Sequence, residues 1–181
     1  MKKLAIALMC IVIALSLVAG AEGKSIIVDE ERGYQFQRPN EAWKDEGGDK
    51  FNDYRFTRKS RIKKKPPWMW IGTREYSPDY PHYSKEDLDL SAIQHDWIRG
   101  MAEKYKLKNM KIIEEDFTVV DEHPAFWSIT EYKVGKYNWR EKVYLVEGDE
   151  FYYRLRFSCL KRYFGKHLEE FEQLVKSFKL L

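Results

Sequence analysis

Two hydrophobic periodicities alternate along the chain, and together they predict a domain that mixes strands and helices. Alternating apolar and polar residues predict strands at 25–28, 34–37 and 53–57, and one or two strands within 111–120. Segment 68–72 (WMWIG) is apolar on both faces. A strand of that kind should be central in its sheet and covered on both sides.

A meander of three strands is predicted next, and its two turns set the expected pairing. The first turn, a Gly-Lys pair, places Glu131 opposite Arg140. The second turn, a Gly-Asp pair, places Glu141 opposite Arg156. One face is then apolar and forms the expected core face: Trp127, Ile129, Tyr144, Val146, Phe151, Tyr153, Leu155 and Phe157. The other face is mixed: Ser128, Thr130, Tyr132, Glu141, Val143, Tyr152, Arg154 and Arg156.

Two segments have apolar residues spaced three or four apart, which is typical of amphipathic helices. The first helix is expected to begin with Ser84 as N-cap and Asp87 as its capping partner, and to end near Lys106. Its predicted buried stripe is Leu90, Ile93, Trp97, Met101 and Tyr105. The second helix is expected from about 163 to 179, with the stripe Phe164, Leu168, Phe171, Val175 and Phe178.

The first 21 residues have the three-part pattern of a secretory signal. A positive start at 1–3 precedes an uncharged apolar run, and 19–21 (AGA) follows as a cleavage motif. The apolar run is about 15 residues long, shorter than the ~20 that span a bilayer, so cleavage after Ala21 is favoured over a retained anchor. We therefore expect an exported protein, periplasmic or extracellular, with 22–181 as a single domain.

Charge and motif content argue against nucleic-acid binding and against known catalytic sites. The net charge of +3 falls to about +1 when the two lysines of the leader are removed. The four histidines lack zinc-site spacing, and the chain contains no GxSxG, HExxH or phosphate-binding glycine loop. Cys159 ends an apolar strand, as a buried thiol would. We predict a non-enzymatic protein with no catalytic residue, metal site or cofactor, while a hydrolase with an unrecognised histidine–carboxylate pair stays the alternative.

Three segments carry a resemblance to a known family. They are 33–39 (GYQFQRP), which leads to Trp43, the hairpin 144–153 (YLVEGDEFYY), and 171–179 (FEQLVKSFK) at the end of the last helix. In this order the chain resembles the PsbP-like superfamily, which includes exported bacterial proteins of the DcrB-like kind. The resemblance covers nearly all of 22–181. It implies an α+β fold with an antiparallel sheet flanked by helices, an α/β/α sandwich, and a role as a binding or assembly module.

Two groups of residues are candidates for binding. The first is the exposed basic run 58–65: Arg58, Lys59, Arg61, Lys63, Lys64 and Lys65. The second is Glu141, Arg154 and Arg156, which would floor a polar cleft if no helix covers them; the alternative is that they form plain cross-strand ion pairs. We expect the partner to be a protein or an anionic envelope component. The alternative is a polysaccharide or lipid headgroup bound by the basic run, with membrane contact but no span.

Overall fold

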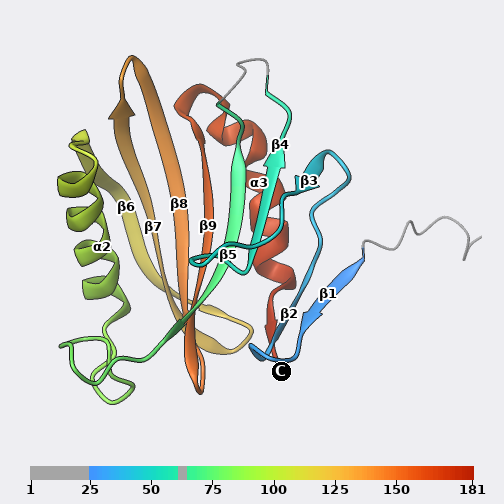
Figure 1. Cartoon of the computed structure of the whole chain (residues 1–181), viewed down its shortest axis with the longest axis vertical. Coiled ribbons are helices and arrows are strands. Elements are labelled where there is room, and N and C mark those ends of the chain that lie inside the picture. The colour runs from blue at the N-terminus through green and yellow to red at the C-terminus, as the bar shows by residue number, and fades with distance from the viewer. Residues whose placement is uncertain (1–24, 61–64) are drawn as a thin grey trace, which may run out of the picture.

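The computed structural model describes residues 25–60 and 65–181. The predicted signal, and Arg61, Lys63 and Lys64 of the basic run, lie outside the described residues. Within those residues, seven strands form one antiparallel sheet (Figure 1). In spatial order they are β3 (Trp43–Asp45), β4 (Tyr54–Arg58), β5 (Trp68–Glu75), β9 (Phe151–Leu160), β8 (Tyr137–Glu147), β7 (His123–Val134) and β6 (Lys108–Val120).

A smaller antiparallel sheet and two helices complete the described domain. The small sheet has the order β1 (Ile26–Asp29), β2 (Tyr34–Gln37) and β10 (Lys179–Leu180). The helices are α2 (Leu90–Lys104) and α3 (Phe164–Ser177), and a single 3₁₀ turn, η1 (Lys161–Tyr163), leads into α3. Among the described residues, no helix is long and apolar enough to cross a membrane.

The two helices contact different residues of the same strand. On α2, Leu90 and Ile93 form a buried cluster with Val143 and Leu145 of β8. On α3, Phe171 packs instead against Tyr144, with 6.0 Å between the ring centres. Neighbouring residues of a strand point to opposite faces, so the helices meet β8 from opposite sides.

The predicted core face of the meander is confirmed. Ile129, Tyr144, Val146, Tyr153, Leu155 and Phe157 are all buried in the main core, and Trp127 and Phe151 pack against its margin. The central position of segment 68–72 is also confirmed, because β5 lies between β4 and β9. Trp70 is buried but Trp68 is only half-buried, so the outer cover of this strand is incomplete.

One predicted register is right and the other is shifted. Glu131 pairs with Arg140 as expected. Glu141, however, lies opposite Ser158, and Arg156 lies opposite Val143. The last pair before the turn is Glu147 with Tyr152, so residues 148–151 form the connection. This connection is two residues longer than the two-residue turn that was expected. A shift of two residues keeps every side chain on its predicted face, which is why the core prediction survives.

The start of α2 was predicted wrongly. The helix begins at Leu90, and its N-cap is Asp89, whose carboxylate accepts a hydrogen bond from the backbone N–H of Ala92 at 2.9 Å. Ser84 caps a separate turn, in which it accepts from the backbone of Asp87 at 3.2 Å. Tyr105 follows the last helical residue and is 56% exposed, so it does not belong to the buried stripe.

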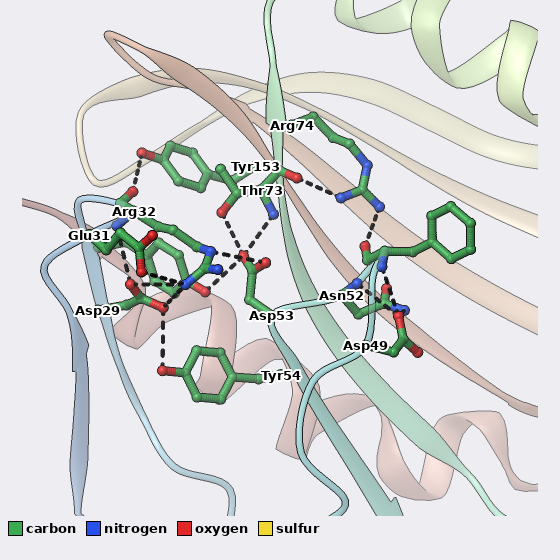
Figure 2. Close-up of polar contacts among 12 residues, drawn as sticks. Asp29, Glu31, Arg32, Asp49, Asn52, Asp53, Tyr54, Thr73, Arg74 and Tyr153 are labelled. Carbon is green, nitrogen blue, oxygen red and sulfur yellow. Dashed lines mark hydrogen bonds and ion pairs between the residues drawn. The ribbon is translucent and has the colours of Figure 1, made fainter.

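A polar network attaches the small sheet to the large one (Figure 2). Asp53 accepts hydrogen bonds from the backbone and the hydroxyl of Thr73 at 2.8 and 2.6 Å, and from Tyr34 of β2 at 3.1 Å. Arg32, in the β1–β2 turn, lies between Asp53 and Asp29, with N–O distances of 3.3 and 3.2 Å. The charged groups are thus paired with one another, as an interface between two sheets requires.

Antiparallel pairing gathers the strand connections at two ends of the sheet (Figure 1). The β4–β5, β7–β8 and β9–α3 connections share one end, and their basic residues define what we call the cationic end: Arg58, Lys59, Lys65, Lys136, Lys161, Arg162 and Lys166. The opposite end, which we call the acidic end, holds the β1–β2, β6–β7 and β8–β9 turns: Glu30, Glu31, Asp121, Glu122, Asp149 and Glu150.

Candidate functional site

The residues predicted to bind a ligand fall into two separate places. Of the basic run, Arg58, Lys59 and Lys65 lie at the cationic end. Glu141, Arg154 and Arg156 lie together on the mixed face of the sheet, beneath α2. The structure therefore brings together residues within each group but does not join the two groups.

The second group is enclosed. The guanidinium of Arg156 lies between two indole rings, 4.6 Å from the ring centre of Trp70 and 4.4 Å from that of Trp97 on α2. It forms an ion pair of 2.7 Å with Glu141, which has no exposed surface. Trp97 also covers Arg154 at 5.0 Å, and burial lowers the pKa of Arg154 to about 10. Because α2 covers these groups, they form a buried ion-pair cluster and not the floor of an open cleft.

Glu170 on α3 organises the side chains at the base of the cationic end. Its carboxylate accepts hydrogen bonds from Asn40 at 3.0 Å, from the indole N–H of Trp43 at 3.3 Å, and from Arg58. The Nδ1 atom of His167 lies 3.1 Å away. Burial raises the pKa of Glu170, but the bonds from Arg58, Asn40 and His167 outweigh burial and lower it overall. Glu170 is therefore held as an anion that positions Arg58 and His167.

A hollow of about 420 Å³ lies beside this cluster, and we call it the basic pocket. Three parts of the chain line it: the end of β4 with the two residues after it, the residue before β5, and the junction of η1 with the first turn of α3. The lining residues are Arg58, Lys59, Ser60, Pro67, Tyr163, Lys166 and His167. No carboxylate is among these described lining residues. An anion is the ligand that such a lining favours.

A second hollow of about 510 Å³ lies at the same end of the sheet, and we call it the tyrosine groove. Lys136, Tyr137, Asn138, Leu160, Lys161 and Arg162 line it. The ammonium groups of Lys65 and Lys136 each lie 5.6 Å from the ring centre of Tyr137. Cations beside an amphipathic ring are typical of surfaces that meet a lipid interface.

The acidic end also contains a pocket, of about 480 Å³. Its charged lining residues are Glu30, Glu31, Arg32, Asp149 and Glu150, together with His123. Within the part of the chain that the structure describes, no group of three or more His, Cys, Asp or Glu side chains has metal-binding geometry. The charges of the two ends are thus opposite, which gives the domain a polar axis along its strands.

The positions of the histidines test the alternative hypothesis that the protein is an enzyme. That alternative predicted a histidine in a cleft within hydrogen-bond distance of a carboxylate, and His167 meets this description. Its partner Glu170, however, is already bound by Arg58, Asn40 and Trp43. A carboxylate so occupied orients the ring but is a poor proton acceptor.

Sequence reasoning missed the contribution of α3 to the basic pocket. Lys166 and His167 lie about a hundred residues after Arg58, so no local pattern joins them. One signal was available: Lys161, Arg162 and Lys166 all lie at or just before the start of a helix, where the helix dipole disfavours cations.

Comparison with known proteins places the fold but not the function. No protein-family model matches the chain, and no curated protein matches its sequence. Among solved structures, cyanobacterial PsbP (CyanoP) from Synechocystis sp. PCC 6803 has a TM-score of 0.62 at 15% identity, covering 90% of this chain and 96% of its own. LpqN of Mycobacterium tuberculosis, described as involved in cell envelope biogenesis, has a TM-score of 0.55 at 8% identity, covering 89% and 87%.

A third structure is a Pseudomonas aeruginosa protein of unknown function, described as a putative regulator. It has a TM-score of 0.52 at 13% identity, covering 84% of this chain and 94% of its own. The likeness to these structures over most of the chain confirms the predicted PsbP-like fold: an antiparallel sheet with two helices among the described residues. At these identities the likeness concerns the fold alone.

Proposed function

We propose that this protein is an exported, non-enzymatic accessory module of the cell envelope, and that it binds an anionic envelope component through its cationic end. The observation that carries this proposal is that two hollows with basic linings, the basic pocket and the tyrosine groove, lie at one end of the domain. We interpret the domain as a helix–sheet–helix sandwich that presents this end as a rigid surface.

Two further observations support an envelope location. The segment 1–21 has the pattern of a secretory signal, and residues 22–181 contain the whole described fold. LpqN, one of the proteins with the same fold, is described as involved in cell envelope biogenesis. PsbP-like and envelope-related neighbours fit an exported accessory module, and none of the described names implies catalysis.

Electrostatics sets the expected strength of binding. A basic side chain near an anionic membrane surface contributes ~1 kcal/mol. Lys59, Lys136, Arg162 and Lys166 are all exposed at the cationic end, so together they would contribute about 4 kcal/mol. That corresponds to weak, reversible attachment that salt should reverse, since exposed charges are screened.

The test is co-sedimentation with lipid vesicles. The protein recovered from cells expressing the full-length chain should bind vesicles of phosphatidylglycerol and phosphatidylcholine, and should not bind phosphatidylcholine alone. The triple variant Lys59→Glu, Lys136→Glu, Lys166→Glu should lose at least tenfold in binding. Replacing Lys63, Lys64 and Lys65 with alanine tests the basic run separately.

A matched control reverses the same amount of charge at the acidic end. Lys50, Lys85 and Lys179 lie near that end, and their replacement by glutamate should change vesicle binding by less than twofold. Equal losses in both triple variants would mean that total charge and not the cationic end decides binding. If the wild-type protein does not bind anionic vesicles at low salt, the proposal that it binds anionic lipid is refuted.

A further inference from the structure

We propose that the basic pocket is a phosphate-binding site, one that holds the phosphate group of a lipid headgroup or of a free phosphate compound. This inference rests on the proposed function, because it assigns one hollow of the cationic end to one chemical group. It makes a separate claim, since an anionic surface could be bound by dispersed charge without any pocket for phosphate.

The donors in the pocket match phosphate in type and arrangement. Arg58 supplies a guanidinium, which has five N–H donors in a planar fork suited to phosphate oxygens. Lys59, directly after the end of β4, and Lys166 on α3 add two ammonium groups from two different parts of the chain. A ligand in the hollow would be approached by cations from more than one direction, as a phosphate with several charged oxygens requires.

The Arg58 side chain is positioned in advance. Glu170 binds its Nη1 atom, and the guanidinium lies 5.9 Å from the ring centre of Trp43. Arg58 and Glu170 are 26% and 23% exposed, so this pair is largely withdrawn from solvent. One carboxylate holds the guanidinium in place, and the remaining N–H groups of the fork can address a phosphate. Held side chains lose less entropy on binding than mobile ones.

The start of α3 adds to the positive potential beside the same hollow. Tyr163 is the N-cap of α3, and no side chain caps the helix. The first turn contains no acidic residue, although acidic residues are favoured there. Lys166 lies in that turn and lines the basic pocket, whereas Lys161 is paired with Glu131 at 2.8 Å and Arg162 lines the tyrosine groove. An anion in the basic pocket would be attracted both by the start of the helix and by Lys166.

The size of the hollow indicates what surrounds the phosphate. At about 420 Å³ the basic pocket is in the range of small-ligand sites, so it has room for a phosphate with a small attached group. A phospholipid would place its phosphate and part of its glycerol region in this hollow, whereas a free phosphate compound would place its phosphate group there.

The experiment measures phosphate binding and vesicle binding on the same protein. Inorganic phosphate is titrated by equilibrium dialysis with radiolabelled phosphate, at constant ionic strength set by sodium chloride. A water-soluble short-chain phosphatidic acid forms the second arm, and anionic vesicles form the third. The test variant is Lys59→Gln with Lys166→Gln, and the control is Lys136→Gln with Arg162→Gln in the tyrosine groove.

We expect the wild type to bind phosphate saturably, and the Lys59→Gln, Lys166→Gln variant to lose at least tenfold in affinity. The control variant should keep its phosphate affinity within twofold. Short-chain phosphatidic acid that binds at least tenfold more tightly than inorganic phosphate would identify the lipid headgroup as the source. Equal affinities for the two probes would identify a free phosphate compound.

Two results would overturn the inference, and both differ from failure of the proposed function. The first is a wild type that binds anionic vesicles but shows no saturable phosphate binding, which leaves the envelope proposal standing without the pocket. The second is phosphate binding that survives in the Lys59→Gln, Lys166→Gln variant. Both variants change exposed side chains, so unchanged thermal unfolding should show that the fold is intact.

Discussion

Removing one partner of the Glu141–Arg156 pair should destabilise the protein far more than removing both. Glu141 is fully buried, and among the described residues its carboxylate has no well-aligned hydrogen-bond donor, so Arg156 at 2.7 Å is its main compensation. The variant Glu141→Leu leaves the guanidinium enclosed by Trp70 and Trp97 without a counter-ion. Breaking a buried ion pair in this way generally lowers the free energy of unfolding by about 3–5 kcal/mol.

The two indole rings reduce this cost, because a guanidinium between aromatic faces keeps about 1–2 kcal/mol of cation–π attraction. We therefore expect Glu141→Leu to lower the free energy of unfolding by about 3 kcal/mol, and the melting temperature by about 6–12 °C. The double variant Glu141→Leu, Arg156→Met should recover to within about 1 kcal/mol of the wild type, since two apolar side chains of similar volume fill the same space.

Urea unfolding followed by tryptophan fluorescence and by circular dichroism measures all four members of this double-mutant cycle. The coupling energy between the two substitutions should be at least about 2 kcal/mol, with unchanged m-values. A double variant as unstable as the sum of the two single variants would refute it. Vesicle binding by the double variant should equal that of the wild type, because these residues lie beneath α2 and away from the cationic end.

Three further results are expected. Glu170→Gln should make the stability of the protein less dependent on pH in acid. The pKa of Glu170 in the folded protein is lowered from its ordinary 4.5, so the stability that its carboxylate contributes is complete above pH 4.5 and is lost as the pH falls through the folded pKa. Urea unfolding at several pH values measures this dependence. Burial raises the pKa of Cys159 to about 12, so this thiol should react with a disulfide reagent at mildly alkaline pH only after denaturation, and rapid labelling of the native protein would contradict its burial. Asp89→Ala should cost about 1 kcal/mol in chemical denaturation through loss of the α2 cap, whereas Ser84→Ala should cost less than about 0.5 kcal/mol; the reverse order would restore Ser84 as the cap.

Periodicity in the sequence was a reliable guide to faces and a poor guide to positions along the chain. The alternating pattern placed Tyr144 and Leu155 in the core, and both are there. The same pattern could not place Glu141 opposite Ser158, because a strand shifted by two residues presents the same faces. Only the length of the β8–β9 connection distinguishes the two registers. The cap of α2 was misplaced for a similar reason, since Ser84 and Asp89 both precede turns and either can cap one.

The candidate site was predictable only in part. The basic run is visible as letters in the sequence, and Arg58 and Lys59 do line a hollow. Lys166 and His167 come from the last helix, and their place beside Arg58 depends on how α3 packs across the sheet. Arg154 and Arg156 alternate on the mixed face as predicted, but no local pattern states whether α2 covers that face.

The sequence by itself determined what each residue can do locally: which side chains share a face, where charge accumulates, and which segment has the pattern of a leader. Short-range geometry is enough for this, because strand and helix periods repeat within a few residues. The tertiary structure alone decided that Trp97 closes over Arg156 and that α3 brings Lys166 to Lys59. These contacts join residues from distant parts of the chain, and they depend on helix packing that no single segment contains.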